Sequence, residues 1–392
     1  MTGMGSSSQV RRWRSIRRAG RHAGLALGLA ALADAAGQLE RRDLGFVQAG
    51  GQFPIDGGKG DPAGFAVGHV TRTGVPWPGV DAALTFAGVL LDGRLYFPDR
   101  PAPQWEPVLK LRGAGYIDGV LPYQDGDDLD DLSLYGHSLG AGTGARHYFG
   151  NFARIGLYSE LLYDYRYRLF EEKGEPPPGY LVPPDGGEHL VTLRAGAGGQ
   201  RPSLNRPVGS ELQASASAGF RDRWSDWGPA DLRQGDDDLF LRLSAEADSV
   251  IGLGGDTGRQ LGLGLSGGWV DDADWLSAFV LGGAMGRVPF GKLHGYYNRE
   301  LLAEWFALAN ADLIQPLGRS LSGHLYADLA LCDLVNPGTG DGARWEGGLG
   351  IGLGFAGPWR GEWLLTYGYA AAAERDGERG GHEVALQALF PF

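Results

Sequence analysis

Regular alternation of apolar and polar side chains is the main pattern of this chain, and it is clearest at the carboxy terminus. From Trp363 to Tyr369 every second residue is large and apolar, and after a polar loop the pattern resumes and ends at Phe392. Successive side chains of a β-strand point to opposite faces, so these residues predict two strands with one shared apolar face. In water such a face at a chain end promotes aggregation, whereas lipid solvates it on a closed barrel. We expect the closing hairpin of an outer-membrane β-barrel.

A second alternating stretch covers residues 153–169. Its apolar residues share one face, and its charged residues share the other. A helical period would scatter these charges around all sides, so a strand is favoured. We expect the charged residues Asp164, Arg166 and Arg168 to face the barrel lumen. We expect five aromatic residues to face lipid: Tyr163, Tyr165, Trp363, Tyr367 and Phe390.

The rest of the chain reads as further strands joined by polar or glycine-rich loops. The expected strands are 44–52, 64–72, 82–90, 108–118, 132–147, 153–169, 190–199, 211–220, 238–247, 261–270, 275–286, 306–317, 321–331, 349–355 and the closing hairpin. Together they make an all-β, antiparallel transmembrane barrel of about sixteen strands, an even number as in single-chain bacterial barrels. Counting back from the carboxy terminus places the proline-rich loop 171–187 on the periplasmic side, where turns are short. This conflict points to a miscount of one or two strands in the first half.

The amino terminus has the pattern of an export signal. Six arginines precede an apolar core at residues 23–32, and Ala33-Asp34-Ala35 forms a small-x-small cleavage site. The apolar run is too short for a membrane helix, which disfavours an anchor. We expect a signal peptide at 1–35 and the barrel at 36–392. Removing residues 1–35 takes away six Arg and one Asp and moves the formal charge from −12 to −17, which argues against a nucleic-acid partner.

Composition limits the remaining chemistry. The chain has 68 Gly but also 11 Trp, 15 Tyr and 16 Phe, so disorder is a poor explanation for the glycines. In Leu349-Gly-Ile351-Gly-Leu353-Gly-Phe355 they suggest a strand with one bulky face and one crowded face. The single cysteine, Cys332, excludes an intramolecular disulfide. The histidines are not paired at ligand spacing and the acidic clusters lack calcium-loop spacing, so we expect no metal and no cofactor.

One motif suggests an enzyme. Residues 136–140, Gly-His-Ser138-Leu-Gly, match the nucleophile elbow of lipases, with Asp185 and His189 as available partners. That elbow requires a strand before the serine and a helix after it, whereas strand-like alternation continues here to Tyr148. We favour small residues on a barrel strand and no enzymatic activity, and we keep a serine esterase or lipase using Ser138 as an alternative.

Two short motifs in the last third of the chain belong together. The first is Leu293-His294-Gly295-Tyr296, and the second is Tyr326-Ala327-Asp328-Leu329-Ala330, with three further strands to the terminal phenylalanine. This arrangement resembles the carboxy-terminal barrel of the BamA/TamA-type outer-membrane assembly factors, the bacterial surface antigen superfamily. In that family an Arg-Gly motif on the sixth extracellular loop folds into the lumen and meets an F-x-D-x-G element on the barrel wall.

The resemblance implies that Leu293, His294, Gly295 and Tyr296 fold into the lumen and that Tyr326, Asp328 and Ala330 receive them. His294 replaces the family's Arg, and Ala330 replaces its Gly. A histidine still donates a hydrogen bond to Asp328 but becomes a charge partner only when protonated. Only a short segment separates residue 35 from the first expected strand, so we expect a barrel without the family's POTRA domains.

The sequence therefore predicts a barrel of the bacterial outer membrane, exported by its signal peptide, with a role in membrane biogenesis or in protein or solute translocation. A passive porin-like channel is the alternative within membranes. Expected partners are outer-membrane lipid and the barrel-assembly machinery. The residues that this machinery would read as the assembly signal are Leu386, Phe390 and Phe392.

Overall fold

The computed structural model describes residues 44–392 except 56–61, 98–104, 117–118, 125–126, 150–155, 202, 236–237, 255–257, 285–290, 337–341 and 376–377. The predicted signal peptide at 1–35 and the predicted start of the barrel region at residue 36 lie outside the described residues. In the described part of the chain, no helix is long and apolar enough to cross a membrane.

The chain folds into a closed antiparallel β-barrel with sixteen strands in its wall, which confirms the predicted fold class. The wall strands are β1 (Leu44–Pro54), β2 (Ala63–Thr73), β3 (Asp81–Ala87), β4 (Leu90–Tyr96), β5 (Trp105–Ala114), β8 (Leu134–Tyr148), β9 (Tyr158–Glu172), β10 (Gly186–Arg201), β11 (Val208–Arg221), β12 (Leu239–Gly252), β13 (Gln260–Val270), β15 (Leu301–Pro316), β16 (Leu321–Leu334), β17 (Ala343–Ala356), β18 (Glu362–Arg375) and β19 (Glu378–Pro391).

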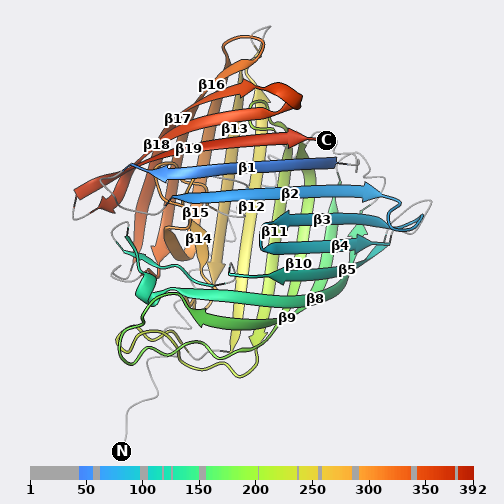
Figure 1. Cartoon of the computed structure of the whole chain (residues 1–392). Coiled ribbons are helices and arrows are strands. Elements are labelled where there is room, and N and C mark those ends of the chain that lie inside the picture. The colour runs from blue at the N-terminus through green and yellow to red at the C-terminus, as the bar shows by residue number, and fades with distance from the viewer. Residues whose placement is uncertain are drawn as a thin grey trace, which may run out of the picture.

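Closure of the barrel comes from the first and last strands. β1 lies beside β19 (Figure 1), and their register runs from Phe46 opposite Pro391 to Pro54 opposite Glu383. The Phe392 amide adds a hydrogen bond of 2.9 Å to the Gly45 carbonyl. The described wall thus has both of its end strands paired, which is how a barrel satisfies its backbone groups in lipid. The residue pairs also place Leu44 and Phe392 at the same end of the barrel, called here the termini end.

The short elements outside the wall are few among the described residues. β14 (Phe279–Leu281) pairs with β15 beyond the point where β13 ends, so it extends one row of the sheet without adding to the ring. β6 (Tyr123–Gln124) and β7 (Asp127–Asp128) form a small hairpin, and two 3₁₀ turns cover Asp130–Leu132 and Pro358–Arg360.

The two faces of the wall differ as the alternation predicts. On β9, Leu161 and Tyr163 are 55% and 41% exposed on the outer face, whereas Glu160 and Asp164 are 2% and 8% exposed toward the interior. Arg146 of β8 pairs with Glu160 at 2.6 Å inside the barrel. The predicted lumenal and lipid-facing sides of this strand are confirmed, because an apolar outer face and a charged interior are what a bilayer selects.

Aromatic side chains gather on the outer face at the termini end. The ring of Trp363 is stacked on Phe355 with centroids 6.0 Å apart, and it meets Phe390 edge-on at 5.8 Å. Trp363 and Phe390 thus lie on the outer face, as predicted. Tryptophan and phenylalanine at such a position suit the boundary between lipid tails and headgroups.

One expected strand was wrong and one strand was missed, so the errors cancel in the total. The segment 82–96 forms two strands, β3 and β4, joined at Gly88 and Val89, so one strand was missed. The predicted strand 275–286 is not a wall strand: among its described residues the strand is limited to Phe279–Leu281, and Phe279 and Leu281 are fully buried. Apolar alternation inside a barrel looks like that of a lipid-facing strand, which explains the second error. The false strand lies in the second half of the chain, not in the first half where the miscount was expected, and its removal places the proline-rich loop 173–185 at the end opposite the termini.

That opposite end, called here the loop end, is covered by loops that pack on one another. An apolar cluster there joins Trp227 of the β11–β12 loop, Trp275 of the β13–β15 segment and Leu134 at the start of β8. Trp227 and Trp275 are 0% and 4% exposed, and the Trp275 indole donates a hydrogen bond of 2.8 Å to the Val335 carbonyl. The loops form a packed cover over this end of the barrel.

Candidate functional site

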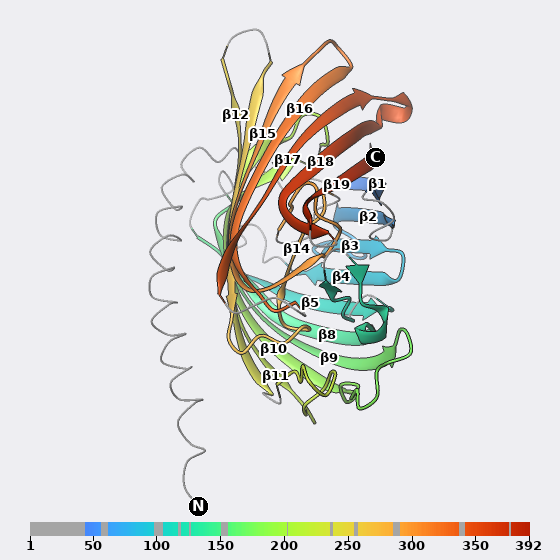
Figure 2. The same cartoon turned by 90° about the vertical axis from the view of Figure 1, so that its left-hand side faces the viewer.

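Between β13 and β15, the described residues 271–284 and 291–300 turn into the barrel interior. Figures 1 and 2 show β14 and the chain beside it enclosed by the wall strands. The Gly282 amide bonds to the Gly291 carbonyl at 2.7 Å, and the Leu293 amide bonds to the Gly283 carbonyl, so the described parts of the segment form a stem. Leu293 has no exposed surface and packs in the cluster that includes Ala330 of β16. We call residues 271–300 the lumenal loop.

The first half of the lumenal loop is anchored to the wall by charge. Asp274 accepts a hydrogen bond of 2.5 Å from Arg221 at the end of β11, and both side chains are nearly fully buried. Glu188 of β10 is surrounded by Arg168 at 3.1 Å, Arg166 at 3.8 Å and Arg221 at 3.5 Å. Three guanidinium groups around one carboxylate leave a positive surplus, which the Asp274 carboxylate offsets.

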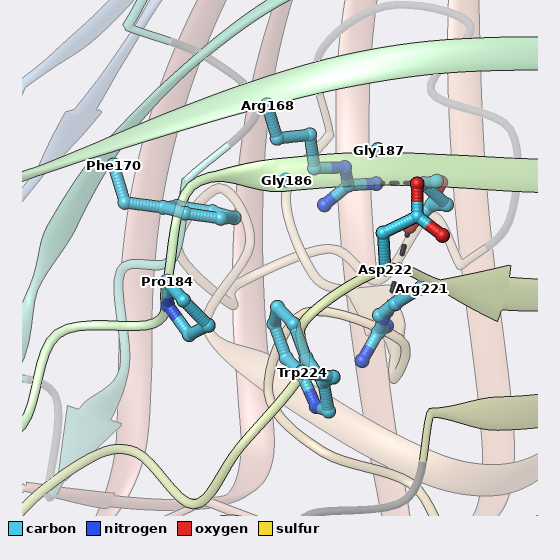
Figure 3. Close-up of a pocket in the computed structure, with 9 residues that line it drawn as sticks. Arg168, Phe170, Pro184, Gly186, Gly187, Arg221, Asp222 and Trp224 are labelled. Carbon is cyan, nitrogen blue, oxygen red and sulfur yellow. Dashed lines mark hydrogen bonds and ion pairs between the residues drawn. The ribbon is translucent and has the colours of Figure 1, made fainter.

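A small pocket opens beside this anchor, as Figure 3 shows. Arg168 and Arg221 reach it from one side, and Phe170 and Trp224 form its apolar side. The Arg221 guanidinium lies 4.4 Å from the centroid of the Trp224 ring. Because Arg221 pairs with Asp274 and stacks on this ring, residues that line the pocket help to hold the loop in place.

The tip of the loop meets the wall through His294. Its Nδ1 atom and its backbone amide lie 2.6 and 2.7 Å from Oδ2 of Asp328 on β16. The imidazole is stacked on Tyr326 with centroids 4.1 Å apart. Asn310 of β15 donates to the other oxygen of Asp328 at 2.6 Å and to the Lys292 carbonyl at 2.8 Å. Asp328 thus accepts three groups that hold the loop tip.

Gly295 and Tyr296 extend the contact to three more strands. The Gly295 amide donates to Glu383 of β19 at 2.9 Å, and the Tyr296 hydroxyl donates to Glu346 of β17 at 2.6 Å. Gln52 of β1 donates to the Tyr296 carbonyl at 2.7 Å and also bonds to Glu383. The tip therefore contacts both sides of the junction between β1 and β19.

Glycines of the wall leave the space into which the tip fits. A Cβ atom on Gly348 would overlap the His294 backbone, and one on Gly368 would overlap the Gly295 amide. Gly295 itself has φ +85°, and a Cβ atom there would overlap the backbone of Tyr369 and Ala370. The crowded face expected for the glycine-rich strand is thus the face that receives the lumenal loop.

Burial decides the charge of His294. The residue is 1% exposed, and this burial lowers the pKa of the His294 imidazole, while Asp328 and Asp312 oppose the shift and Lys292 adds to it. Near neutral pH the contact with Asp328 is therefore a hydrogen bond from a neutral ring. An arginine at this position would keep its charge.

The structure brings the two sequence motifs together in space. Leu293, His294 and Tyr296 are buried against a wall that includes Tyr326, Asp328 and Ala330. The functional role of these residues stays a prediction, as does that of Leu386, Phe390 and Phe392 in assembly.

Sequence reasoning missed the loop residue Asp274 and several partners of the loop: Gln52, Arg221, Glu346 and Glu383. The signal that the sequence offered was a charged or amide residue at a strand position that faces the barrel interior. That signal does not say which distant strand supplies the partner.

Ser138 lacks the geometry of a nucleophile elbow. Residues 134–148 form one uninterrupted strand, and Ser138 lies opposite Arg168 of β9. Of the proposed partners, Asp185 accepts from the Phe170 amide, and the His189 ring lies at the outer face, 2.8 Å from the Tyr163 hydroxyl. Neither is directed at Ser138. Among the described residues, no group of three or more His, Cys, Asp or Glu is placed to hold a metal ion.

These features define an outer-membrane β-barrel with a loop of its own wall docked in its lumen. No family model and no curated protein matches the sequence. Among solved structures the chain is similar to CdiB from Acinetobacter baumannii, with 9% identity and a TM-score of 0.57 over 90% of this chain and 60% of that chain. It is also similar to BamA from Haemophilus ducreyi lacking POTRA domains 1–3, with 10% identity and a TM-score of 0.56 over 89% and 71% of the two chains. CdiB from Escherichia coli is similar too, with 11% identity and a TM-score of 0.57 over 90% of this chain and 64% of that chain.

At these identities the likeness shows a shared fold. The chain has the barrel architecture of BamA and CdiB, in agreement with the resemblance found in the sequence. It spans less than two thirds of the length of both CdiB chains.

Proposed function

We propose that this protein acts in the bacterial outer membrane as a biogenesis or translocation barrel of the BamA and CdiB type. The observation that carries the proposal is the lumenal loop, which is fixed to β11 by Asp274 and to β16, β17, β19 and β1 by residues 294–296. A loop held at two sides of the lumen by buried polar contacts can adopt a docked and a released state. Switching between such states would couple the lumen to a client chain.

The membrane location and the partners belong to the same proposal. Residues 1–35 would direct export, and the barrel-assembly machinery would read Leu386, Phe390 and Phe392 at the end of β19. Leu386 and Phe392 are 39% and 69% exposed on the barrel, so both present apolar surface to lipid after insertion.

A passive porin-like channel is less well supported, because a passive pore needs an open lumen. Here the loop tip packs against the interior face of the wall, and loops at the loop end pack on one another through apolar side chains. A wild-type barrel with the loop docked should therefore show little steady conductance.

The test is an insertion assay with the purified full-length chain in lipid vesicles. An unfolded eight-stranded outer-membrane barrel is added, and its folding is followed by the gel shift between unheated and boiled samples. We expect faster folding than in vesicles that carry an equal mass of a general porin. We expect the gain to fall in Gly295→Ala, which disturbs the loop tip, and to persist in Gly88→Ala, a turn glycine with φ +60° and open space around it.

Equal folding rates with the wild-type protein and with the porin would contradict the biogenesis proposal. A large steady conductance of the wild-type protein in a planar bilayer would then identify a passive channel.

A further inference from the structure

Three polar side chains near the termini end of the lumen are arranged as a serine, a histidine and an acid. Ser322 and His324 lie two residues apart on β16, so they share its interior face. Ser322 Oγ is 3.1 Å from Nε2 of His324. Nδ1 of the same ring is 3.3 Å from both carboxylate oxygens of Asp312 on the neighbouring strand β15.

In this row the serine hydroxyl, the imidazole and the carboxylate follow one another in the order that activates a serine. A nucleophilic serine needs a base within hydrogen-bond reach, and the base needs a third group that fixes its tautomer. A proton on Nδ1, held by Asp312, leaves the lone pair of Nε2 directed at Ser322 Oγ. Such triads recur on unrelated folds and are recognised by geometry. We propose that Ser322, His324 and Asp312 form a hydrolytic site for short carboxylic esters that reach the lumen from the termini end.

A fourth side chain converges on the same point. Asn205, in the turn between β10 and β11, is 9% exposed, and its side-chain oxygen makes no hydrogen bond among the described residues. A Cβ atom on Gly354 of β17 would overlap both Asn205 Oδ1 and Ser322 Oγ, so the amide and the hydroxyl face each other across this glycine. The oxygen that lies there is an acceptor, but the two ends of an amide are assigned only from their partners, and a half-turn of the Asn205 amide places its N–H donors beside Ser322. A donor next to the nucleophile is what stabilises the oxyanion formed when serine attacks a carbonyl.

The reaction that this arrangement supports is ester hydrolysis through an acyl-serine. His324 Nε2 takes the hydroxyl proton while Ser322 Oγ bonds to the carbonyl carbon. The bond from that carbon to the alkoxy oxygen then breaks, and His324 returns the proton to the leaving alcohol. Water attacks the acyl-serine with His324 again as base, and the proton passes back to Ser322 Oγ. The sum is ester and water giving acid and alcohol, with Asp312 holding the charged imidazole.

The turn that carries Asn205 covers the site. The Ser203 hydroxyl and the backbone amides of Leu204 and Asn205 all donate to one oxygen of Glu362 at the start of β18, at 2.7, 2.6 and 3.1 Å. These three bonds fix a turn from one part of the wall over strands in another. Ser322 and His324 are 3% and 2% exposed under it, whereas the Asp312 side chain is 27% exposed. Access to Ser322 therefore requires this turn to move, and loss of the Glu362 carboxylate should ease that movement.

The experiment uses the full-length protein in detergent micelles, with its fold checked by the gel shift on boiling. A fluorophosphonate probe tests for an activated serine, with the labelled peptide identified by mass spectrometry, and p-nitrophenyl butyrate tests for turnover. We expect labelling at Ser322, faster labelling in Glu362→Ala and none in Ser322→Ala. Loss of the base in His324→Gln should reduce turnover by at least about 100-fold. Asp312→Asn should reduce turnover while leaving Ser322 in place.

Ser138→Ala is the matched control, since Ser138 is also a buried serine on an interior strand face, but its neighbour in the sheet register is Arg168. It should keep full labelling and turnover. Absence of labelling in both the wild type and Glu362→Ala would overturn the proposal, and so would turnover that survives in folded Ser322→Ala. Neither result would bear on the insertion assay, because the two sites share no residue.

Discussion

Replacement of Gly295 by alanine gives the sharpest test of how the lumenal loop is held. Gly295 has φ +85°, which costs a residue with a Cβ atom about 1–2 kcal/mol. The new methyl would overlap the backbone of Tyr369 and Ala370, and overpacking of this kind costs about 1–3 kcal/mol. If the tip moves away, the hydrogen bond from the Gly295 amide to Glu383 is lost, which removes about 0.5–1.5 kcal/mol.

Even the lower end of the two strain terms, about 2 kcal/mol together, shifts the docking of the tip by about 30-fold. The wall should persist, because Gly295 lies outside every strand pairing of the barrel. We therefore expect a barrel that still shifts its gel mobility on boiling but shows new conductance steps in a planar bilayer, where the wild type shows few.

Gly88→Ala is the control for backbone strain, since Gly88 has φ +60° but no atom lies within 4 Å of the position that its Cβ would take. It should leave conductance at the wild-type level. A Gly295→Ala barrel with wild-type conductance and wild-type mobility would refute the reasoning, because it would mean that the tip does not depend on this close approach.

Four further predictions concern the same loop and the wall. Burial lowers the pKa of the docked His294 ring, whereas the released ring has its usual pKa of about 6.5 and takes up a proton as the pH falls. Docking is therefore strongest above that pH and weakens below it. Conductance at about pH 5 and about pH 7.5 should differ in the wild type and not in His294→Gln. Substitution of both His294 and Asp328 should lower the free energy of unfolding by about 0.5–3 kcal/mol less than the sum of the two single substitutions. Simple additivity would exclude the contact. Tyr296→Phe leaves Glu346 without its hydroxyl donor, and denaturant titration should show a loss of about 1–3 kcal/mol. Leu193→Arg places a charge on the lipid-facing side and should destabilise the inserted barrel by about 2–4 kcal/mol near the bilayer centre, with unchanged stability arguing for a different orientation of β10.

The strands that could be predicted are those whose two faces meet different surroundings. β9, β18 and β19 separate lipid from a polar lumen, so their alternation is strong and their faces were assigned correctly. β4 was missed because the two-residue turn at Gly88 and Val89 hardly interrupts the alternation of its neighbours. The prediction of a wall strand at 275–286 was wrong because burial inside the barrel and contact with lipid select the same apolar residues.

The candidate sites depended on the sequence to different degrees. The motif around His294 and the motif around Asp328 could be paired through a family resemblance, and the structure places them in contact. No local pattern marked Glu383 or Gln52 as partners of the loop, because they lie at opposite ends of the chain and meet only when β1 pairs with β19. The Ser138 motif was conspicuous in the sequence, yet residues 134–148 form one uninterrupted strand, and Asp185 and His189 make their contacts elsewhere.

Local patterns were enough to predict the fold class, the faces of the strongest strands and the residues of the two loop motifs, because each of these is recorded in neighbouring residues. The folded barrel was needed to establish which strands close the ring, which end carries the long loops and which carboxylates receive the loop tip. It also placed Ser322, His324 and Asp312 in one row, since Asp312 reaches His324 only through the register of β15 with β16. Contacts between strands depend on register and closure, which are properties of the whole barrel and of no single segment.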